Sequence, residues 1–368
     1  MWERLQSTLL ESVSQRQRAF LVSLNEWGML VVVDGIITVI SEYCPFMLQL
    51  SCFVPTNIFM PAASPARAIF GLSILTLCIV TAIFLVVGGL LLYALIKFRE
   101  KPQQDDREPV QLFGSNQIEL SWTVIPILIV VVLFLATARV IIATERSHPP
   151  EGALHVTVVG HQYWWEFRYP GTQVVTANEL HIPTSDPSHP RPTYLNMISA
   201  DTDHSFWVPR LAGKMDVIPN KINVMWFDPQ QPGLYLGQCA QYCGTQHAKM
   251  LIRVYAQTPS EFQQWMNAQA LPAALDPQMS AGRAVFERNA CMNCHQVRGT
   301  VADGRFGPDL THFGSRDTLA SGAVTNTPEH LRQWIADPSH YKDGALMPAM
   351  HLKDADIDLV SKYLESLQ

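Results

Sequence analysis

The sequence predicts a multidomain membrane protein with a two-helix transmembrane hairpin, an all-β domain and a small helical domain. Two long apolar runs without charge predict the hairpin, because about 20 apolar residues span the ~30 Å hydrocarbon core of a bilayer. Short β-type runs follow from residue 154, and helical spacing returns after residue 280. We therefore expect the three parts to follow one another along the chain.

Composition supports a membrane-anchored, cofactor-binding protein. Of the 368 residues, 48% are apolar and only 16% are charged. The net charge of -6 gives no reason to expect nucleic acid as a partner, and a mildly acidic surface suits a basic protein. Four of the seven cysteines form two close pairs, at 239/243 and 291/294, which is typical of cofactor attachment rather than of a disulfide framework.

Residues 1–56 form an N-terminal extension. Its apolar run, residues 27–41, is short and contains Asp34, so it is a poor membrane span. A signal segment, lipid attachment at Cys52 and an ordinary cysteine in a terminal tail are the alternatives. A start codon farther along the sequence, at Met29 or Met47, is a further interpretation.

The hairpin is expected within residues 57–144, with helices at about residues 68–97 and 120–143. No charged residue occurs within residues 68–96 or 120–138. Two buried core helices are the alternative, but the length of the runs and their content of Val, Ile and Leu favour membrane helices. Basic residues in the connecting segment favour the cytoplasmic side for that segment.

Residues 145–268 are predicted to form the all-β domain, as a sandwich or barrel. Turn residues such as Pro170-Gly171 separate the β-type runs, and metal sites in such domains lie on loops at one end. The predicted strands are Leu154–Val159, Tyr163–Tyr169, Tyr194–Ile198, Ile222–Phe227, Leu234–Gln238 and Leu251–Ala256.

Residues 239–250, which we call the cysteine loop, hold Cys239, Cys243, His247 and Met250. Thiolate, imidazole and thioether are soft-to-borderline ligands that suit copper better than magnesium or calcium. Two thiolates four residues apart could bridge a pair of copper ions, and His204 is the candidate for a second histidine. A disulfide or a zinc loop is the alternative.

Residues 269–278 are predicted to be a linker and residues 279–368 a separate helical domain. The domain carries Cys291-Met-Asn-Cys294-His295. This spacing lets both thiols add to haem vinyl groups while the adjacent histidine ligates iron. A thioredoxin-like motif is the alternative, but no βαβ pattern surrounds these cysteines.

These motifs resemble those of one family. The pattern C-x-x-x-C-x-x-x-H-x-x-M in the cysteine loop, with His-Ser-Phe-Trp-Val-Pro at 204–209, resembles the CuA loop of cytochrome c oxidase subunit II. Residues 57–61 and 119–126 resemble that family's lead into its two helices, and residues 306–310 and 346–350 resemble class I cytochrome c. The resemblance covers roughly residues 57–368 and implies a cupredoxin-like Greek-key barrel and an all-α class I cytochrome c domain.

The resemblance also implies the cofactors and their ligands. One covalently bound haem c is expected on Cys291 and Cys294, with His295 and Met347 as its axial ligands. A dinuclear CuA centre is expected with two histidines on separate coppers, two bridging cysteines, a methionine and a backbone carbonyl. Its ligands would be His204, Cys239, the carbonyl of Gln241, Cys243, His247 and Met250.

Two positions depart from the family pattern. Gln241 stands where relatives carry a glutamate that helps to hold magnesium at the interface with subunit I. An amide is a weaker magnesium ligand than a carboxylate, so we expect this ion to be absent or bound differently. Tyr163 stands where relatives carry a tryptophan that faces soluble cytochrome c, which leaves Trp164 and Trp165 as candidates for the electron route.

The function implied is that of an electron-transfer subunit of a terminal respiratory oxidase. Electrons would pass from a cytochrome c-type or other respiratory donor to haem c, to CuA and to subunit I, which reduces oxygen to water and pumps protons. Subunits I and III are the implied partners. The resemblance places Glu119 beside a proton-channel entrance; a glutamate favoured by the helix macrodipole is the alternative.

The implied location is the bacterial inner membrane. Haem attachment to c-type motifs is completed outside the cytoplasm, so both metal-binding domains are expected on the periplasmic side. A CuA subunit of a nitric oxide reductase and a membrane-tethered copper carrier with a redox-sensor haem are the alternative functions. A carrier would need open, exchangeable ligands, whereas the ligand set here would saturate its metals.

We predict that Met347, not Met350, is the sixth ligand of the haem iron. A thioether opposite His295 raises the haem potential, and Pro348 stiffens the loop behind Met347. Met347→Ala should therefore abolish the weak red absorption of sulfur-to-ferric-iron charge transfer and lower the potential. Met350→Ala, at a position expected in the core, should leave both unchanged; loss of the band in that variant alone would contradict the prediction. Ligation by His312, His330, His340 or His351 is the alternative.

Overall fold

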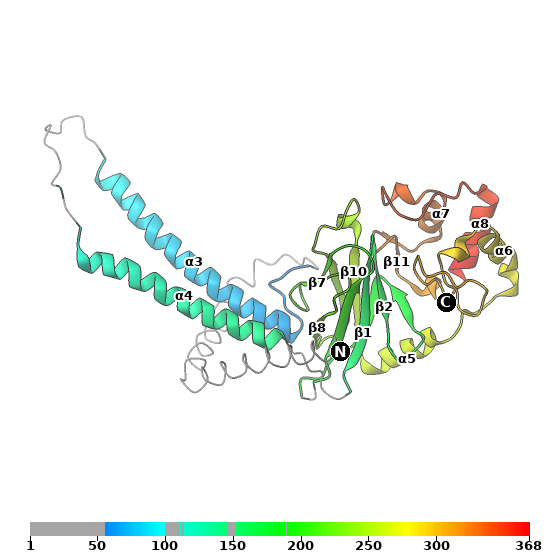
Figure 1. The fold of residues 1–368 in the computed structure, drawn as a ribbon, viewed down its shortest axis with the longest axis horizontal. Coiled ribbons are helices and arrows are strands. Elements are labelled where there is room, and N and C mark those ends of the chain that lie inside the picture. Colours follow the sequence, from blue (N-terminus) through cyan, green and yellow to red (C-terminus); the bar gives the residue numbers. More distant parts are fainter. Residues whose placement is uncertain (1–55, 100–110, 112–113, 146–151, 189) are drawn as a thin grey trace, which may run out of the picture. The chain divides into compact units, whose positions relative to one another are not determined.

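The computed structural model describes residues 56–99, 111, 114–145, 152–188 and 190–368 (Figure 1). The expectations for Asp34, Cys52 and the rest of residues 1–55 lie outside the described residues. The chain is divided into two compact units. Residues 68–143 belong to one unit, and residues 56–67 belong with residues 144–368 to the other.

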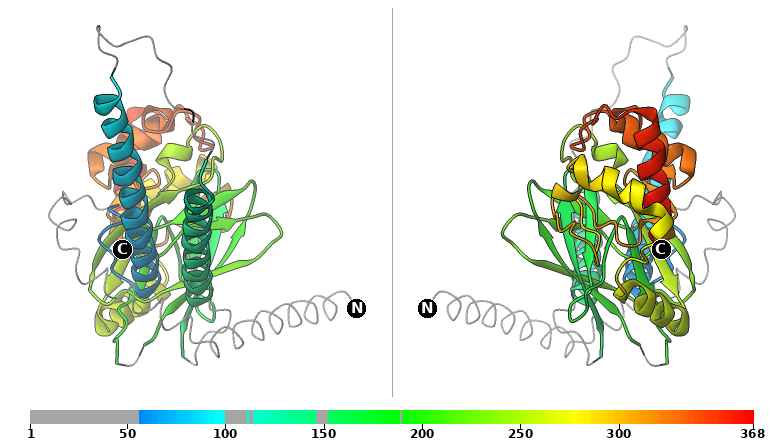
Figure 2. Two further views of the ribbon diagram at one scale, coloured as in Figure 1. Left: turned by 90° about the vertical axis from the view of Figure 1, so that its left-hand side faces the viewer. Right: turned by 90° about the vertical axis from the view of Figure 1, so that its right-hand side faces the viewer.

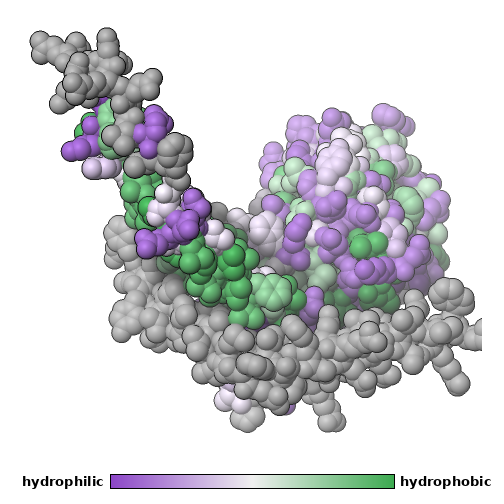
Figure 3. All heavy atoms as spheres, turned by 60° about the vertical axis from the view of Figure 1, so that its left-hand side comes forward, coloured by the Kyte–Doolittle hydropathy of each residue, from purple (hydrophilic) through white to green (hydrophobic). Residues whose placement is uncertain are grey.

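The first unit contains most of two helices that are long and apolar enough to cross a membrane, α3 (Ser64–Lys97) and α4 (Asn116–Thr144). The first turn of α3 and the last residue of α4 belong to the second unit. Figure 3 shows apolar side chains gathered along them, as expected for helices whose surroundings are lipid. Both begin about one turn before the predicted starts, because their first turns contain polar residues that the hydropathy pattern excludes. Ser64, for example, donates from both its backbone N–H and its hydroxyl to Asp228.

The β domain in the second unit consists of two five-stranded sheets that pack face to face. One has the order β3-β2-β1-β5-β8 and the other β4-β10-β9-β6-β7, and each contains one parallel pair, β1 with β5 and β4 with β10. The strands are β1 (Leu154–His161), β2 (Trp164–Arg168), β3 (Val175–Ala177), β4 (Glu179–Pro183), β5 (Thr193–Ser199), β6 (His204–Trp207), β7 (Met215–Val217), β8 (Asn223–Phe227), β9 (Gly233–Cys239) and β10 (Leu251–Gln257).

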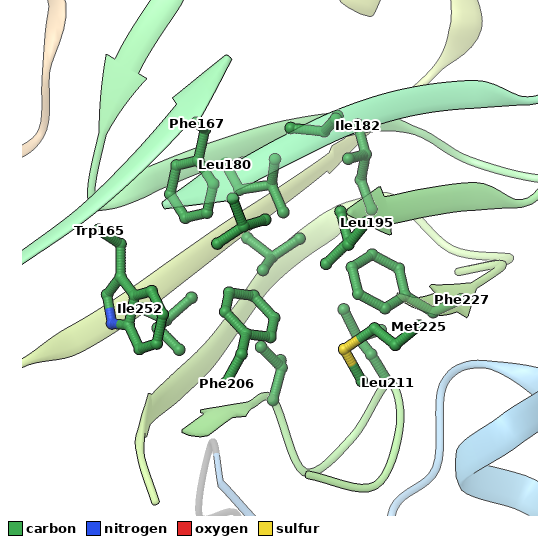
Figure 4. Close-up of a cluster of buried hydrophobic side chains, with 14 of the residues drawn as sticks. Trp165, Phe167, Leu180, Ile182, Leu195, Phe206, Leu211, Met225, Phe227 and Ile252 are labelled. Carbon is green, nitrogen blue, oxygen red and sulfur yellow. The ribbon is translucent and has the colours of Figure 1, made fainter. Parts of the chain in front are cut away.

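Alternation along the strands builds the core between the two sheets. In β2 the side chains of Trp165 and Phe167 point inward and are fully buried, whereas their neighbours are not. Figure 4 shows these two rings near Phe206 of β6, with Leu195 of β5 farther along the core beside Phe227. The six predicted strands are all present. The short strands β3, β4, β6 and β7 were not predicted.

A helix that was not expected, α5 (Pro259–Ala270), follows β10 and extends into the predicted linker. Thr258 caps its start: the hydroxyl accepts from the backbone N–H of Glu261, and the Glu261 side chain accepts from the backbone N–H of Thr258. The sequence Thr-Pro-Ser-Glu contains this capping-box signal, which could have revealed the helix.

The C-terminal domain is mainly helical, as predicted, with α6 (Ser280–Arg288) packed against α8 (Asp354–Glu365). Figure 2 shows the yellow α6 crossing the red α8. Gly282 permits this close crossing, since a Cβ there would lie 2.2 Å from the carbonyl oxygen of Leu359. Its β structure, among the described residues, is a two-stranded pair and an isolated bridge between Gln296 and Asp303. The remaining elements are β11 (Thr318–Leu319), β12 (Val324–Thr325), α7 (Pro328–Ala336) and the 3₁₀ turns η3 (Pro277–Met279), η4 (Cys291–Asn293), η5 (Phe313–Ser315) and η6 (Pro338–His340).

Candidate metal centres

Neighbouring strands deliver the residues of the first candidate centre to one end of the β domain. Strand β9 ends at Cys239, and β10 begins directly after Met250, so the cysteine loop connects two paired strands. Strand β6 begins at His204 and pairs with β9. Within the loop, Gly244 has φ +129°, a conformation that side-chain-bearing residues rarely adopt.

The two cysteine sulfurs lie at the middle of a compact set of donor atoms. They are 3.9 Å apart, so they are free thiols and not a disulfide, whose sulfurs would be separated by about 2.05 Å. The Sγ of Cys243 lies 3.9 Å from Sδ of Met250. The Sγ of Cys239 lies 3.2 Å from the carbonyl oxygen of Gln241. Thioether and carbonyl therefore approach different cysteines.

Each cysteine also has one imidazole beside it. Nδ1 of His204 lies 4.0 Å from Sγ of Cys239, and Nδ1 of His247 lies 3.7 Å from Sγ of Cys243. The other ring nitrogen of His204, Nε2, lies 2.8 Å from the Asp201 carboxylate. A carboxylate that holds one ring nitrogen directs the other toward the ligand position, as outer residues do in metal sites.

The centre is buried, which shapes its electrostatics. His204 and Met250 are fully buried, and both cysteines are at most 4% exposed. Hydrogen-bond contact with Cys243 lowers the pKa of Cys239, and contact with His204 lowers it further despite burial. The same contact raises the pKa of Cys243, because two adjacent thiolates repel in the absence of a cation. The site therefore favours a cation that can neutralise both sulfurs.

The donor set fits copper and a dinuclear centre. Four donor atoms surround the two cysteine sulfurs, which gives six donors in all, more than the four ligands of a closed zinc site. They include a thioether, which suits copper. The structure thus brings together all of the residues that the sequence analysis assigned to this centre: His204, Cys239, Gln241, Cys243, His247 and Met250.

The aromatic candidates lie in different surroundings. Trp165 is fully buried and meets the ring of His204 edge-on, with centroids 5.9 Å apart. Trp164 instead stacks on His161, with centroids 4.2 Å apart. Tyr163 contacts the cysteine loop, because its hydroxyl accepts from the backbone N–H of Thr245. Trp165 and Tyr163 therefore lie at the candidate copper site, and Trp164 does not contact its ligands in any described interaction.

The second candidate centre is the haem motif of the C-terminal domain. Nδ1 of His295 lies 2.8 Å from the carbonyl oxygen of Pro308, which leaves Nε2 as the nitrogen that can bind iron. Burial lowers the pKa of His295 and keeps the ring neutral, as a metal ligand must be. Gly307 packs on this ring, since a Cβ there would lie 2.6 Å from its Cε1 atom. Cys291 and Cys294 are free and half-buried, as covalent attachment requires.

The two methionines considered as haem ligands differ in burial. Met347 is half-buried, whereas Met350 is 39% exposed. The expectation that Met350 belongs to the core is therefore wrong, because it lies in the loop that precedes α8. Among the alternative ligands, His312 is buried, and its Nε2 lies 3.0 Å from the carbonyl oxygen of Leu271. His340 and His351 are exposed.

Glu119 lies apart from both centres in the chain, in the first turn of α4. Its side chain is exposed. A carboxylate in the first turn of a helix is stabilised by the helix macrodipole, so its position agrees with the structural alternative as well as with the proton-channel role.

Comparison with known families agrees with this architecture. Residues 54–140 match the family described as the transmembrane domain of cytochrome c oxidase subunit II. Residues 188–257 match the family described as the periplasmic domain of that subunit, and residues 279–368 match the cytochrome c family.

Individual relatives of this chain are named cytochrome c oxidase subunit 2. Cytochrome c oxidase subunit 2 of Alkalihalophilus pseudofirmus is 33% identical over 315 residues, which cover 84% of this chain and 90% of the relative. That of Bacillus sp. strain PS3 is 33% identical over 291 residues, covering 74% and 80%. Among solved structures, the chain is similar to the periplasmic domain of subunit II of cytochrome oxidase of Bradyrhizobium japonicum, with 25% identity and a TM-score of 0.31; 33% of this chain and 96% of that chain are covered.

Fold and sites together define a membrane-anchored electron-transfer protein in which a cupredoxin-like domain precedes a cytochrome c domain. The chain belongs to the cytochrome c oxidase subunit II family, in a form that carries a C-terminal cytochrome c domain. It is accordingly a subunit of an oxidoreductase complex, and the family implies copper and haem as its cofactors.

We expect a soluble fragment of residues 145–270 to bind two copper ions per chain. The physical reason is that each cysteine sulfur has its own imidazole beside it, so two coppers held by the thiolates could each receive one histidine. Metal analysis should give two coppers, and the oxidised fragment should show the hyperfine pattern of one electron shared by two copper nuclei. One copper per chain with a blue-copper spectrum would contradict this expectation.

Proposed function

We propose that this chain is the electron-entry subunit of a terminal respiratory oxidase. It takes electrons from a cytochrome c-type or other respiratory donor through haem c and CuA and delivers them to the haem–copper site of subunit I, where oxygen is reduced to water and protons are pumped. Subunit III is a further proposed partner. When bound, the haem and the copper pair supply one-electron redox chemistry.

The observation that carries this proposal is that one chain brings together six candidate copper donors and, in a separate domain, a Cys-x-x-Cys-His motif. The cysteine loop and His204 offer enough donors to saturate two coppers, and His204, Met250 and both cysteines are buried. Catalytic metal sites keep an open position for substrate, which this donor set lacks. A site of this kind suits a relay, in which the rigid β domain holds the ligands still as the charge changes.

The residues around the two sites have distinct proposed roles. Asp201 holds the ring of His204, and Pro308 holds the ring of His295, each through the nitrogen opposite the metal. Trp165 is the aromatic proposed to lie on the route, because it alone of the two tryptophans contacts a copper ligand. Met347 is proposed as the second axial ligand of the haem.

Gln241 supports copper binding but not magnesium binding. Its carbonyl oxygen approaches Cys239, and its side chain is exposed. A neutral amide at this position is a weak ligand for magnesium, which prefers carboxylates. We therefore propose that magnesium at the interface with subunit I is absent or bound by other groups.

The proposed location is the inner membrane of a bacterium, with both metal-binding domains on the periplasmic side. The support is chemical: covalent haem attachment to a Cys-x-x-Cys-His motif is completed outside the cytoplasm. Lys97 and Arg99 lie at the end of α3, where the chain enters the connecting segment, and favour the cytoplasmic side for that segment.

The candidate copper ligands of this chain argue against a quinol oxidase activity. Quinol oxidase subunit 2 of Bacillus cereus is 28% identical over 220 residues, so the chain is similar to it as well. A quinol oxidase of this type needs no copper ligands in its subunit II, whereas this chain brings all six together. A nitric oxide reductase subunit and a copper carrier are the remaining alternatives, and the closed ligand set argues against the carrier.

The proposal is tested by removing one bridging thiol from the intact complex. Cys243→Ser should leave haem c reducible by the donor but stop oxygen consumption, because the chain can accept electrons and cannot pass them on. Haem reduction is followed in the visible spectrum and oxygen with an electrode; Ser339→Ala, a surface change in the haem domain, is the control. Consumption of nitric oxide instead of oxygen by the parent complex, or purification without a many-spanning haem subunit, would overturn the proposal.

Glu119→Gln should slow steady-state oxygen consumption by the same complex and leave reduction of the copper centre by the donor unchanged. A carboxylate beside a proton-channel entrance assists proton uptake, which limits turnover but not electron entry. Stopped-flow reduction and oxygen uptake separate the two steps. Equal turnover in variant and parent would show that Glu119 serves only the helix N-terminus.

A further inference from the structure

Two segments of the cytochrome c domain lie against the β domain, within one compact unit. The first is the turn 317–321, which includes β11; here the backbone N–H of Leu251 donates to the carbonyl of Ser321. The second is the segment 341–344, which leads into Met347. A Cβ at Gly344 would lie 3.6 Å from Cβ of Thr245, so this segment touches the cysteine loop. We call these contacts the docking interface.

Glu179, at the start of β4, is a buried carboxylate whose partners all belong to the other domain. It is 3% exposed. The backbone N–H and hydroxyl of Thr318 donate to its Oε1 at 2.9 and 2.7 Å, and the backbone N–H of Asp317 lies 3.3 Å from Oε2. Burial raises the pKa of Glu179. A buried carboxylate is costly unless it is hydrogen-bonded, so these donors are what make its position tolerable.

Lys342 is a buried charged residue of the cytochrome c domain whose side chain contacts the β domain, as Glu179 does in the opposite direction. It is 4% exposed, and its Nζ donates to the carbonyl oxygen of Tyr163 at 2.8 Å. The hydroxyl of Ser321 donates to the same carbonyl at 2.7 Å. Burial lowers the pKa of Lys342 to about 7. One carbonyl of the β domain thus accepts from both segments of the docking interface.

The docking interface lies at the candidate copper site. Tyr163, whose carbonyl accepts those two bonds, also packs its ring on Gly244, where a Cβ would lie 2.5 Å from the tyrosine oxygen. Gln246 lies between the copper-ligand candidates Cys243 and His247 in the chain, and its side chain donates to the carbonyl of Asp343. The segment that precedes the haem-ligand candidate therefore contacts the loop that carries the copper ligands.

We propose that Glu179 and Lys342 are positioning residues that hold the cytochrome c domain in one register on the β domain, with residues 341–344 against the cysteine loop. The inference rests on the proposed function for its purpose, because a fixed register gives electron transfer between the two sites without a prior search. Each residue acts through the hydrogen bonds that it makes across the docking interface. Lys342 also lies near enough to Cys243 for their charges to interact. Two buried polar anchors specify register, since any shift would leave both unpaired.

The test compares Glu179→Gln and Lys342→Met, singly and together, in the intact complex. Glu329→Gln and Lys362→Met make the same chemical changes at exposed positions of the cytochrome c domain and serve as controls. Hydrogen exchange of the Asp317 and Thr318 amides reports docking, since both donate to Glu179. Laser photoreduction of the haem, followed at the copper band, reports transfer between the sites.

We expect the double variant to lower the protection of these two amides about tenfold or more, equivalent to about 1.4 kcal/mol, and to slow the transfer in parallel. Haem and copper spectra should remain those of the parent, which shows that both domains are folded and loaded. Unchanged protection in the double variant would overturn the inference, as would equal losses in the controls. Lost protection with unchanged transfer would also overturn it. A parent complex whose haem passes no electron to copper would instead reject the proposed function.

Discussion

The pairing of β9 with its two neighbours is the constraint on which the copper site depends. The backbone N–H of Cys239 donates to the carbonyl of Met250, and that of Ala240 donates to the carbonyl of Ser205, both at 2.9 Å. Three ligand-bearing segments are thus joined by ladder bonds. Gly237 allows this approach, because a Cβ there would lie 2.3 Å from the carbonyl oxygen of Trp207. Strand pairing therefore determines where the ligand-bearing segments meet.

Buried polar groups are concentrated at this end of the β domain, and their cost explains why the surrounding fold is so well packed. His204, Ser205 and Glu179 are all buried. Each charged or ligand-bearing group among them has a partner, such as Asp201 for His204. A rigid core of aromatic side chains lies directly behind them and prevents the site from relaxing when one charge changes. The dense packing of the core is therefore what keeps the candidate copper ligands in place.

The sequence could predict the longer strands and the two apolar helices because their patterns extend over enough residues to be recognised, whereas α5 was missed despite its 12 residues. Strands β3, β6 and β7 have only three or four residues each, too few for alternation to be visible, and they exist because longer neighbours pair with them. Strand β4 was also missed, although it is as long as β2 and β8. Two of these short strands carry essential groups: β6 begins at His204 and β4 begins at Glu179. The alternation of apolar and polar residues was therefore hardest to recognise in the strands that carry the buried polar residues His204 and Glu179.

Sequence by itself determined the ligands that lie close together in the chain. The spacings from Cys239 to Met250 and from Cys291 to His295 define their chemistry locally, since a loop of a few residues cannot separate such groups widely. Tertiary structure decided which nitrogen of His204 faces the sulfurs, which tryptophan meets that ring, and how Glu179 and Lys342 join the two domains. These contacts link residues far apart in the chain, whose meeting depends on strand register and on burial, and neither is encoded in any short stretch.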